Sequence, residues 1–530
     1  MNFLYNPRNF IAIWLAWVAV AFFCRPLLPV DETRLVSMAW DIWNHHEVQT
    51  GYPPLFGWLI GAGWTLFGVN DWWPRVPGPL LALLCLFLTI RLGDALWPSR
   101  PRLGRFAPWL LLGSPVWGFW STLVLEDMWL VASVLTALTG ILQASRRGGW
   151  GAWLWWLAGC IAGILYSAPE FMLWILPVLF SASTWSGHRS GRCWWRFFLA
   201  ALLLLMVAVL PLGVWCLMQD AGYLDMNGGS LWLGRWYALQ GRSGHALSFA
   251  IWLVMLGLPW SCWPPLWRSL GNIHRVDAGL RICLIAVAIP VLVLCLLPVS
   301  GLHHLLPALP LLCLAGARLL ASDNAGVRDH DTWLPGAVFA LAALLMLLVP
   351  FAEQIQGVPA WLPAYLSEIP LAAVLTLLAF AVTLWWWRPA RVLDASAGLA
   401  MLMVALSVLV HMVFAQVYYE SYDLMPMAER IRALEANGSP VASWKKYRGE
   451  YTWLGRLKQP VEVLQDMSQL LSWVEAHPEG YVIAVYRVPS AEGRVDAEFW
   501  QPYRNHRRVG LWSAAKLGAQ ADALSRLAAD

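Results

Sequence analysis

The sequence predicts a polytopic α-helical membrane protein that carries a small α/β domain at its C-terminus. Hydrophobic residues make up 59% of the 530-residue chain and charged residues only 13%, a balance that soluble proteins do not have. Apolar stretches of roughly 17 to 25 residues, the length that crosses a bilayer, recur between Phe10 and Gln416. From Val417 onward the composition is mixed. We therefore expect about 13 transmembrane helices in residues 1–416 and one soluble domain in residues 417–530.

The first span has some features of a secretory signal. Arg8 precedes it, and Ala19-Val20-Ala21 has the small-x-small form of a cleavage site. The apolar run continues through Phe23, however, and many further spans follow it. A retained first transmembrane helix is the simpler interpretation.

Arginines are distributed unevenly between the joints that connect the spans. If the N-terminus is cytoplasmic, fifteen arginines fall in inside joints, while the outside joints hold only Arg25, Arg34, Arg235 and Arg242, with Arg75 at a helix edge. Because cytoplasmic joints of membrane proteins are enriched in basic residues, this bias predicts a cytoplasmic N-terminus. After an odd number of spans, the C-terminal domain then lies outside.

Two outside loops are long enough to have a function, at residues 25–73 and 219–246. The first contains a helical pattern in which apolar residues fall opposite polar ones: Leu35, Met38, Ala39 and Ile42 against Arg34, Ser37, Asp41 and His45. The pattern predicts a helix along the membrane surface, with Trp40 and Trp43 at the interface. Asp31 and Glu32 precede it, where an acid commonly caps free N–H groups.

A catalytic role for Asp31 is the alternative to a cap, and it requires other polar residues to converge on it. Acids at further outside ends supply candidates, namely Glu126, Asp127, Glu170, Asp220 and Asp225, whereas long internal spans carry none. The acids therefore gather on the outer face, which favours a site at the membrane surface over a transport path through its middle.

The C-terminal domain has a mixed pattern. Residues 421–438 and 462–477 have the periodicity of amphipathic helices, and residues 440–444 and 481–488 are typical of strands. We expect a sheet edged by helices.

Several familiar chemistries lack their motifs. The nine cysteines have no metal-ligand spacing, and there is neither a Gly-rich phosphate loop followed by Lys nor a zinc-protease His pair. Asp329-His330-Asp331 has the Asp-x-Asp form of a nucleotide-sugar site, but it falls in a short inside joint and is interpreted as a solvated loop. The pattern argues against nucleotide use, and no nucleic-acid partner is expected.

At the level of ordered motifs, the chain resembles a known family. The segments "LLPVDETRLVSMAWDIW", "VLEDMWL" and "SGLHHLLPALPLLCLAGARLL" are similar to the membrane GT-C glycosyltransferases of the protein O-mannosyltransferase and aminoarabinose (lipid A) transferase type. The tail is similar to the periplasmic domain of bacterial members. The resemblance implies a transferase that takes a sugar from a polyprenyl (undecaprenyl) phosphate donor in the inner membrane. Its acceptor would be lipopolysaccharide or lipid A, another envelope glycan, or protein.

The resemblance also implies roles for individual residues. The acid of the first outer loop, the catalytic centre of the family, matches Asp31, and the acid of the second outer joint matches Asp127. Arg34 matches the contact to the lipid phosphate. Further substrate-binding candidates are Glu32, Tyr52 in the turn before the second span, His303, His304, Arg235 and Arg242.

Two departures concern a metal. Where aminoarabinose transferases have Glu-Lys before a Pro-Pro pair, this chain has Gly51-Tyr52, and Trp232 stands where they have a His. In those enzymes the Glu and the His hold a metal. We therefore expect no metal and no other cofactor here.

These residues suggest an inverting mechanism. Asp31 would accept the proton of the acceptor hydroxyl, and Arg34 would stabilise the departing phosphate. Two alternatives are a transporter or flippase for a lipid-linked glycan, which predicts broken mid-membrane helices and an internal repeat, and a non-catalytic membrane scaffold in which Asp31 is only a cap.

Overall fold

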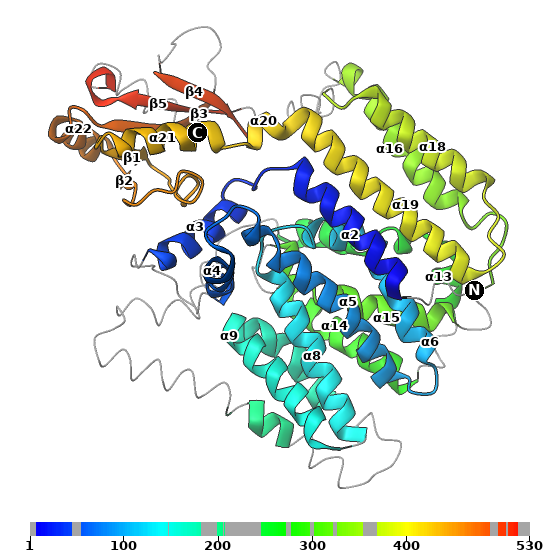
Figure 1. Cartoon of the computed structure of the whole chain (residues 1–530). Coiled ribbons are helices and arrows are strands. Elements are labelled where there is room, and N and C mark those ends of the chain that lie inside the picture. Colours follow the sequence, from blue (N-terminus) through cyan, green and yellow to red (C-terminus); the bar gives the residue numbers. More distant parts are fainter. Residues whose placement is uncertain are drawn as a thin grey trace. The chain divides into compact units, whose positions relative to one another are not determined.

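The computed structural model describes residues 7–44, 55–146, 148–181, 199–204, 206, 245–271, 277–296, 301–321, 326–352, 368–487, 497–504 and 507–517. It is mostly helical and contains one five-stranded sheet (Figure 1). The chain divides into two compact units. One comprises Met1–Ala21, Thr50–Leu55 and Gly78–Val410, and the other comprises Phe22–Gln49, Phe56–Pro77 and His411–Asp530.

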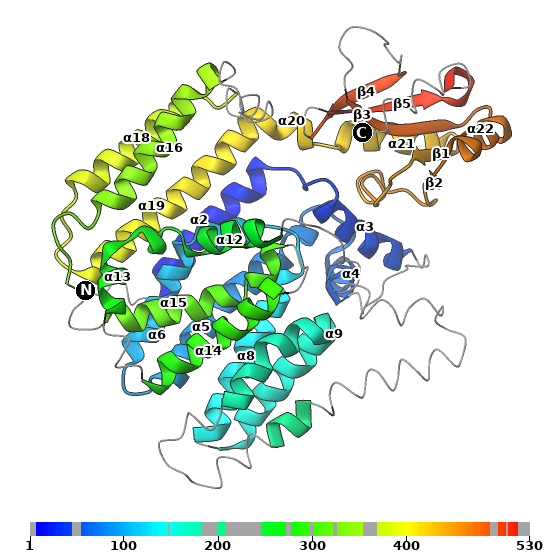
Figure 2. The same ribbon diagram turned by 180° about the vertical axis from the view of Figure 1, so that it is seen from behind.

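The first unit is built from apolar helices. They are most of α2 (Pro7–Cys24), α5 (Pro77–Leu96), α6 (Pro101–Leu112), α7 (Pro115–Trp120), α8 (Asp127–Arg146), α9 (Trp150–Phe180), α12 (His245–Gly257), α13 (Pro264–Leu270), α14 (Ala278–Leu296), α15 (Ala308–Leu320), α16 (Trp333–Ala352), α18 (Leu371–Trp386) and most of α19 (Val392–Val413). Figure 2 shows α16 and α18 lying side by side. The fully buried tryptophans Trp14, Trp17, Trp109 and Trp117 belong to the core of this unit.

Membrane spans are confirmed in the described part of the chain. Four helices there are long and apolar enough to cross a bilayer, at Trp73–Leu96, Asp127–Arg146, Ala278–Leu296 and Val392–Ala436, and shorter apolar helices accompany them. The chain is a multi-pass membrane protein. The expected number of spans and the domain boundary at residues 416 and 417 stay predictions.

Helix α9 is broken in its middle. Ser167 has an extended backbone (φ −165°, ψ 101°) inside an otherwise helical run. Pro169 explains the break, because proline lacks the amide that would continue the hydrogen-bond ladder and its ring crowds the preceding turn. The run from Trp150 to Phe180 therefore consists of two helical halves, and Glu170 lies at the start of the second.

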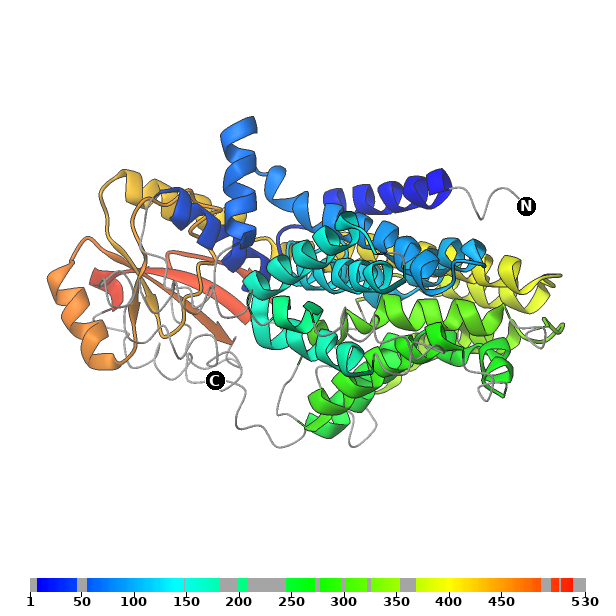
Figure 3. The same cartoon turned by 90° about the horizontal axis from the view of Figure 1, so that it is seen from below.

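The second unit contains the sheet. Its strands are β1 (Val441–Trp444), β2 (Glu462–Leu464), β3 (Tyr481–Arg487), β4 (Phe499–Tyr503) and β5 (Arg507–Ser513), in the order β2-β1-β3-β5-β4. Strand β1 pairs in parallel with β2 and β3, while β5 is antiparallel to β3 and β4. Helices α21 (Met425–Ala436) and α22 (Met467–Ala476) cover opposite faces, as the yellow and orange helices of Figure 3 show. The predicted α/β domain is confirmed.

Both predicted helices of the tail are wrong at their starts. Within residues 421–438, helix α21 begins only at Met425. Residues 462–477 do not form a single helix, because Glu462–Leu464 pairs with β1 as strand β2. The helix begins only at Met467, where the Asp466 carboxylate accepts a hydrogen bond of 2.9 Å from the Gln469 amide. A short edge strand directly before a capped helix has too few residues to show its own periodicity.

The helix predicted in the first outer loop is α3 (Asp31–Trp43), and it packs within the sheet-containing unit. The prediction that Trp40 lies at the membrane interface is wrong. Its side chain is 9% exposed, its ring lies 5.4 Å from that of Trp453, and its Nε1 donates to the Leu457 carbonyl at 2.8 Å. Ser37, expected on the polar side, is also buried and donates to the Gly449 carbonyl at 2.5 Å.

Trp453 is the centre of this packing, and its removal should destabilise the unit. Its ring stacks on Trp64 of α4 (Leu55–Phe67) with centroids 4.4 Å apart, and the Arg456 guanidinium lies 3.2 Å from its centroid. We expect Trp453→Ala to cost about 3–5 kcal/mol, the usual cost of emptying a buried aromatic site. A large drop in the melting temperature of the detergent-solubilised chain would show it.

Trp500→Ala is the matched control, because that tryptophan is 46% exposed on β4. An equal melting temperature for the two variants would mean that the aromatic stack does not stabilise the unit.

Candidate active site

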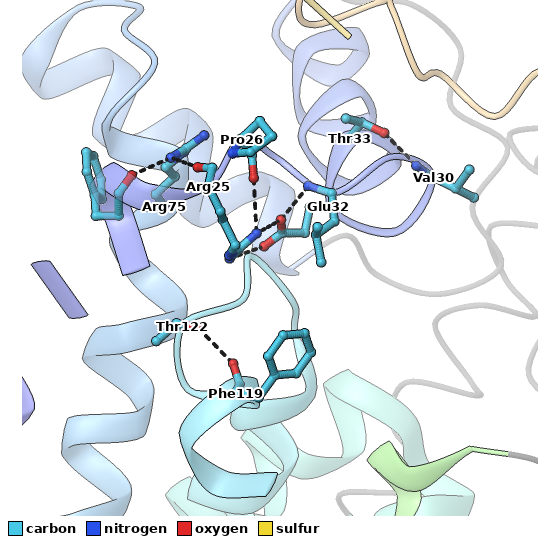
Figure 4. A network of polar contacts seen from close by, with 10 residues as sticks. Arg25, Pro26, Val30, Glu32, Thr33, Arg75, Phe119 and Thr122 are labelled. Atoms are coloured by element: carbon cyan, nitrogen blue, oxygen red, sulfur yellow. Dashed lines mark hydrogen bonds and ion pairs between the residues drawn. The ribbon is translucent and has the colours of Figure 1, made fainter. Parts of the chain in front are cut away.

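A buried ion pair holds the entry to α3 (Figure 4). The Arg25 guanidinium binds the Glu32 carboxylate through both of its terminal nitrogens, one of them at 2.9 Å, and the side chains are 7% and 0% exposed. Glu32 also accepts a 2.6 Å hydrogen bond from the Leu28 amide. A carboxylate satisfied in this way fixes the loop between the first span and α3. Glu32, predicted among the substrate-binding residues, thus has the geometry of a positioning residue.

Arg75 reinforces the same loop. Its Nη1 donates to the carbonyls of Phe22 and Arg25 at 2.9 and 3.0 Å, and its guanidinium lies 5.3 Å from the Phe22 ring centroid (Figure 4). In the sequence, Arg25 and Arg75 count only toward the charge balance of the joints. The sequence feature that could have indicated the Arg25–Glu32 ion pair is an arginine directly after a span, followed seven residues later by an acid.

Val30, the residue before α3, has a strained backbone. Its φ of 77° and ψ of −53° lie in a region that β-branched residues rarely adopt. The Thr33 hydroxyl stabilises the turn by accepting a 3.0 Å hydrogen bond from the Val30 amide. Strain of this kind persists where surrounding contacts enforce it, and it is common at functional sites.

Asp31 and Arg34 both lie exposed on α3. Three residues apart, they share one face of the helix. Within the described residues neither side chain makes a hydrogen bond or an ion pair, because Glu32 and Thr33 make the local contacts instead. The hydrogen-bonded cap expected as one alternative for Asp31 is thus absent there, although the first turn of a helix still favours a negative charge. The pair is held rigidly and left accessible.

Asp127 begins α8 in the other unit. One carboxylate oxygen accepts from Trp120 Nε1 at 3.1 Å, and the other accepts from the Tyr166 hydroxyl at 3.3 Å. Two neutral donors therefore orient a half-buried carboxylate at a helix N-terminus.

A buried pair of a histidine and a glutamate lies in the same unit as Asp127. His304 Nδ1 is 3.4 Å from a carboxylate oxygen of Glu170, and the side chains are 8% and 5% exposed. The His303 and His304 rings lie against each other with centroids 3.9 Å apart and an interplanar angle of 44°. The sequence marked Glu170 as an outer acid but did not pair it with His304, because their proximity depends on the break in α9.

The remaining sequence-based candidates have different outcomes. Tyr52, Arg235 and Arg242 lie outside the described residues. Asp331 of the Asp-x-Asp motif is not part of a solvated loop, since it is 3% exposed and binds Arg268 at 2.6 and 2.5 Å. Asp329 and His330 are exposed, so the predicted solvated loop is wrong only at Asp331, which has a structural role. In the described part of the chain, no cluster of His, Cys, Asp and Glu has the form of a metal site.

Comparison with solved structures establishes the fold. ArnT from Cupriavidus metallidurans, in the apo state and bound to undecaprenyl phosphate, matches with a TM-score of 0.69 in both cases. The match covers 96% of this chain and 99% and 98% of those chains, at 17% identity. The chain therefore has the GT-C fold, as the sequence predicts.

Sequence comparison agrees with the fold. An undecaprenyl phosphate-α-4-amino-4-deoxy-L-arabinose arabinosyl transferase of Pseudomonas paraeruginosa is 24% identical over 518 residues, covering 88% of this chain and 89% of the relative. A polyprenol-phosphate-mannose–protein mannosyltransferase of Mycobacterium tuberculosis is 30% identical over 193 residues, covering 35% and 33%. No family model matches the sequence. The chain thus has the GT-C fold and is similar in sequence to membrane glycosyltransferases that use polyprenyl-type phosphate sugars.

Proposed function

We propose that this chain transfers a sugar from a polyprenyl (undecaprenyl) phosphate donor to an envelope acceptor such as lipopolysaccharide or lipid A, another glycan, or protein. Two groups of relatives support the donor class, because the names of both specify a sugar on a polyprenyl-type phosphate. Their names differ in the group transferred, and only the mannosyltransferase name specifies protein. The proposal therefore specifies the class of the donor but leaves the class of the acceptor open.

The observation that carries the proposal is the exposed Asp31–Arg34 face of α3 above a buried Arg25–Glu32 anchor. In the proposed reaction, the acceptor hydroxyl oxygen attacks the anomeric carbon as its proton passes to Asp31. The bond from that carbon to the phosphate oxygen breaks, and polyprenyl phosphate leaves with the electron pair. Attack opposite the leaving group inverts the anomeric centre. Arg34 offers a fork of donors that matches a phosphate.

The other candidates are assigned supporting roles. Asp127, oriented by Trp120 and Tyr166, is proposed as the second catalytic carboxylate. His303 and His304 are proposed near the donor phosphate, as are Tyr52, Arg235 and Arg242 from the remaining loops. With no Lys before residue 445, arginines and histidines are the cations of the membrane part.

The bacterial inner membrane is the proposed location, with the N-terminus in the cytoplasm and the C-terminal domain in the periplasm. Support comes from the arginine bias of the joints, since fifteen of these residues fall on one side and four on the other. The active face would then meet lipid-linked sugars and envelope acceptors in the periplasm.

Transfer is proposed to be metal-independent, and chelation provides the test. The resemblance places Gly51 and Trp232 where aminoarabinose transferases have the Glu and the His that hold a metal, and neither residue offers a carboxylate or an imidazole. We expect EDTA to leave the rate of sugar transfer by the purified chain unchanged. Loss of activity in EDTA and its recovery with a divalent cation would contradict the proposal.

Glycan analysis tests the function itself. Mass spectrometry of envelope glycolipids, glycans and proteins should show one species that loses a single sugar when the gene is removed. The purified chain with the matching polyprenyl phosphate sugar should then restore that sugar. An unchanged set of glycans would contradict the transferase proposal.

A further inference from the structure

The sheet-containing unit has a cavity of about 470 Å³ at the carboxyl end of β1. Its walls include Ser443 and Trp444 of β1, Ile483 and Val485 of β3, and Tyr503 at the end of β4. Ligands of open α/β sheets commonly bind outside the carboxyl ends of the parallel strands. Pockets of roughly 300–1,000 Å³ hold small ligands, so the cavity has room for a sugar unit.

The cavity is strongly cationic. Five basic side chains line it with a single carboxylate, Glu450: Lys445, Lys446, Arg448, Arg504 and Arg507. Within the described residues, the side chains of Lys446 and Arg507 make no hydrogen bond or ion pair. Gathering like charges at short range is unfavourable unless an anion joins them. The lining therefore points to an anionic ligand.

Local backbone geometry directs two of these lysines. Lys445 follows β1 with a φ of 66°, a left-handed conformation that is uncommon for a residue with a side chain. The Lys445 amide is held by the Leu464 carbonyl at 2.8 Å and the Lys446 amide by the Trp444 carbonyl at 2.9 Å. These two hydrogen bonds hold a strained turn in the wall of the cavity, and backbone strain is frequent at binding sites.

Tyrosines supply the rest of the wall. The Tyr447 hydroxyl lies 2.8 Å from Thr452 Oγ1, and Tyr451 and Tyr503 are 3% and 5% exposed. Burial raises the pKa of all three phenols, so they stay neutral at any physiological pH. Neutral rings with hydroxyl groups suit a sugar, whose surface has both apolar and hydrogen-bonding parts.

The cavity adjoins the candidate catalytic helix within the same unit. Val30, the residue directly before Asp31, lines it, and Arg504 Nη1 donates to the Pro29 carbonyl at 3.4 Å. A ligand in the cavity therefore lies next to the N-terminus of α3.

We propose that this cavity binds an anionic sugar of the acceptor, one that carries a phosphate or a carboxylate, and thereby presents an acceptor hydroxyl to Asp31. The inference rests on the proposed function and narrows its acceptor to an acidic glycan or glycolipid. The donor phosphate is assigned to Arg34 instead. The donor phosphate and the acidic group of the acceptor therefore bind to different basic residues.

Binding is measured first, by calorimetry on the full chain in phosphatidylcholine nanodiscs at constant ionic strength. We expect glucose 6-phosphate and glucuronate to saturate one site and glucose to show no binding. Inorganic phosphate should bind roughly tenfold more weakly than glucose 6-phosphate, because it lacks the sugar contacts. Absence of binding, or phosphate binding as tightly as the sugar phosphate, would overturn the inference.

Lys446→Gln with Arg507→Gln should weaken glucose 6-phosphate binding roughly tenfold, since charged hydrogen bonds are the strong ones. Lys458→Gln is the matched control, because Lys458 is an exposed cation of the same domain outside the cavity wall. Equal affinity in the double variant and the control would also overturn the inference.

Transfer assays separate this inference from the function on which it rests. With the natural acceptor, Lys446→Gln with Arg507→Gln should raise the acceptor KM and leave kcat unchanged. If Asp31→Asn abolishes transfer while the double variant keeps the wild-type acceptor KM, the acceptor inference fails and the proposed function stands. The same holds if the acceptor proves to be an uncharged protein segment. If sugar phosphates bind as expected but the chain transfers no sugar, the proposed function fails.

Discussion

Asp31→Asn should abolish sugar transfer while the protein folds and binds its donor as before. Asparagine keeps the size of the side chain but cannot accept the proton of the acceptor hydroxyl. Removing a general base typically lowers a rate by roughly 10²- to 10⁴-fold. Stability should fall by no more than about 1 kcal/mol, because Asp31 is exposed, makes no hydrogen bond within the described residues and loses only its favourable charge at the helix N-terminus. Initial rates of transfer from the labelled donor, together with a melting curve, give both quantities.

Two acids of the same unit are controls for that experiment. Glu429→Gln removes an exposed carboxylate of α21, and its transfer rate should remain that of the wild type. Asp466→Ala removes a true helix cap, so it should lower the melting temperature while transfer continues. If Asp31→Asn behaves like Asp466→Ala, with lower stability and normal transfer, Asp31 is a structural residue and the proposed base is wrong.

The sequence predicts best where the pattern is long and local. Apolar runs predict the spans, and the period of apolar residues after Asp31 predicts α3 with its correct start. Helix α21 and strands β1 and β3 follow from the same kind of pattern. The predictions fail where the structure depends on a very short element or on a contact between residues far apart in the sequence. Strand β2 has three residues, and Trp40 is amphipathic enough to suit a membrane interface or a protein core equally well.

The pairing of charged residues could not be predicted from the sequence, because it depends on how the loops and strands fold together. The Arg25–Glu32 bond requires the chain to turn at Pro29 and Val30, and Arg75 joins that loop from another part of the same unit. The cationic cavity combines residues 445–448 with Arg504 and Arg507, which are brought near by the pairing of β1 with β3 and of β3 with β5. In the sequence these basic groups are two unremarkable clusters in a domain with balanced charge.

The common feature of the site is that rigid contacts surround an accessible acid. Glu32, Thr33 and Arg75 use their polar atoms on the loop and on the first turn of α3, and Val30 is held in a strained conformation between them. Catalytic groups gain from such preorganisation, because the reacting geometry is then fixed before the substrate arrives. Neighbours of Asp31 should accordingly affect activity through its position.

Glu32→Gln is the variant expected to damage that framework most. It leaves the Arg25 guanidinium buried beside a neutral amide, and breaking a buried pair from one side costs about 3–5 kcal/mol. The melting temperature should fall strongly, and transfer should fall with it, because the first turn of α3 loses its anchor. Glu32 is not expected to contact substrate, so the KM for the donor should change less than kcat.

A double variant distinguishes the contribution of the Arg25–Glu32 ion pair from the cost of leaving one charge buried alone. Arg25→Met with Glu32→Met removes both charges and fills the space, so much of the stability should return, since an apolar pair of similar volume often replaces a buried ion pair without loss. Asp71→Asn serves as the exposed comparison. It breaks the 2.7 Å pair with Arg456, in which Asp71 is 74% exposed, and should change stability by less than about 1 kcal/mol. If Glu32→Gln proves as mild as Asp71→Asn, the buried ion pair does not anchor α3, and the rigidity of Asp31 must come from the packing of Trp40 against Trp453 instead.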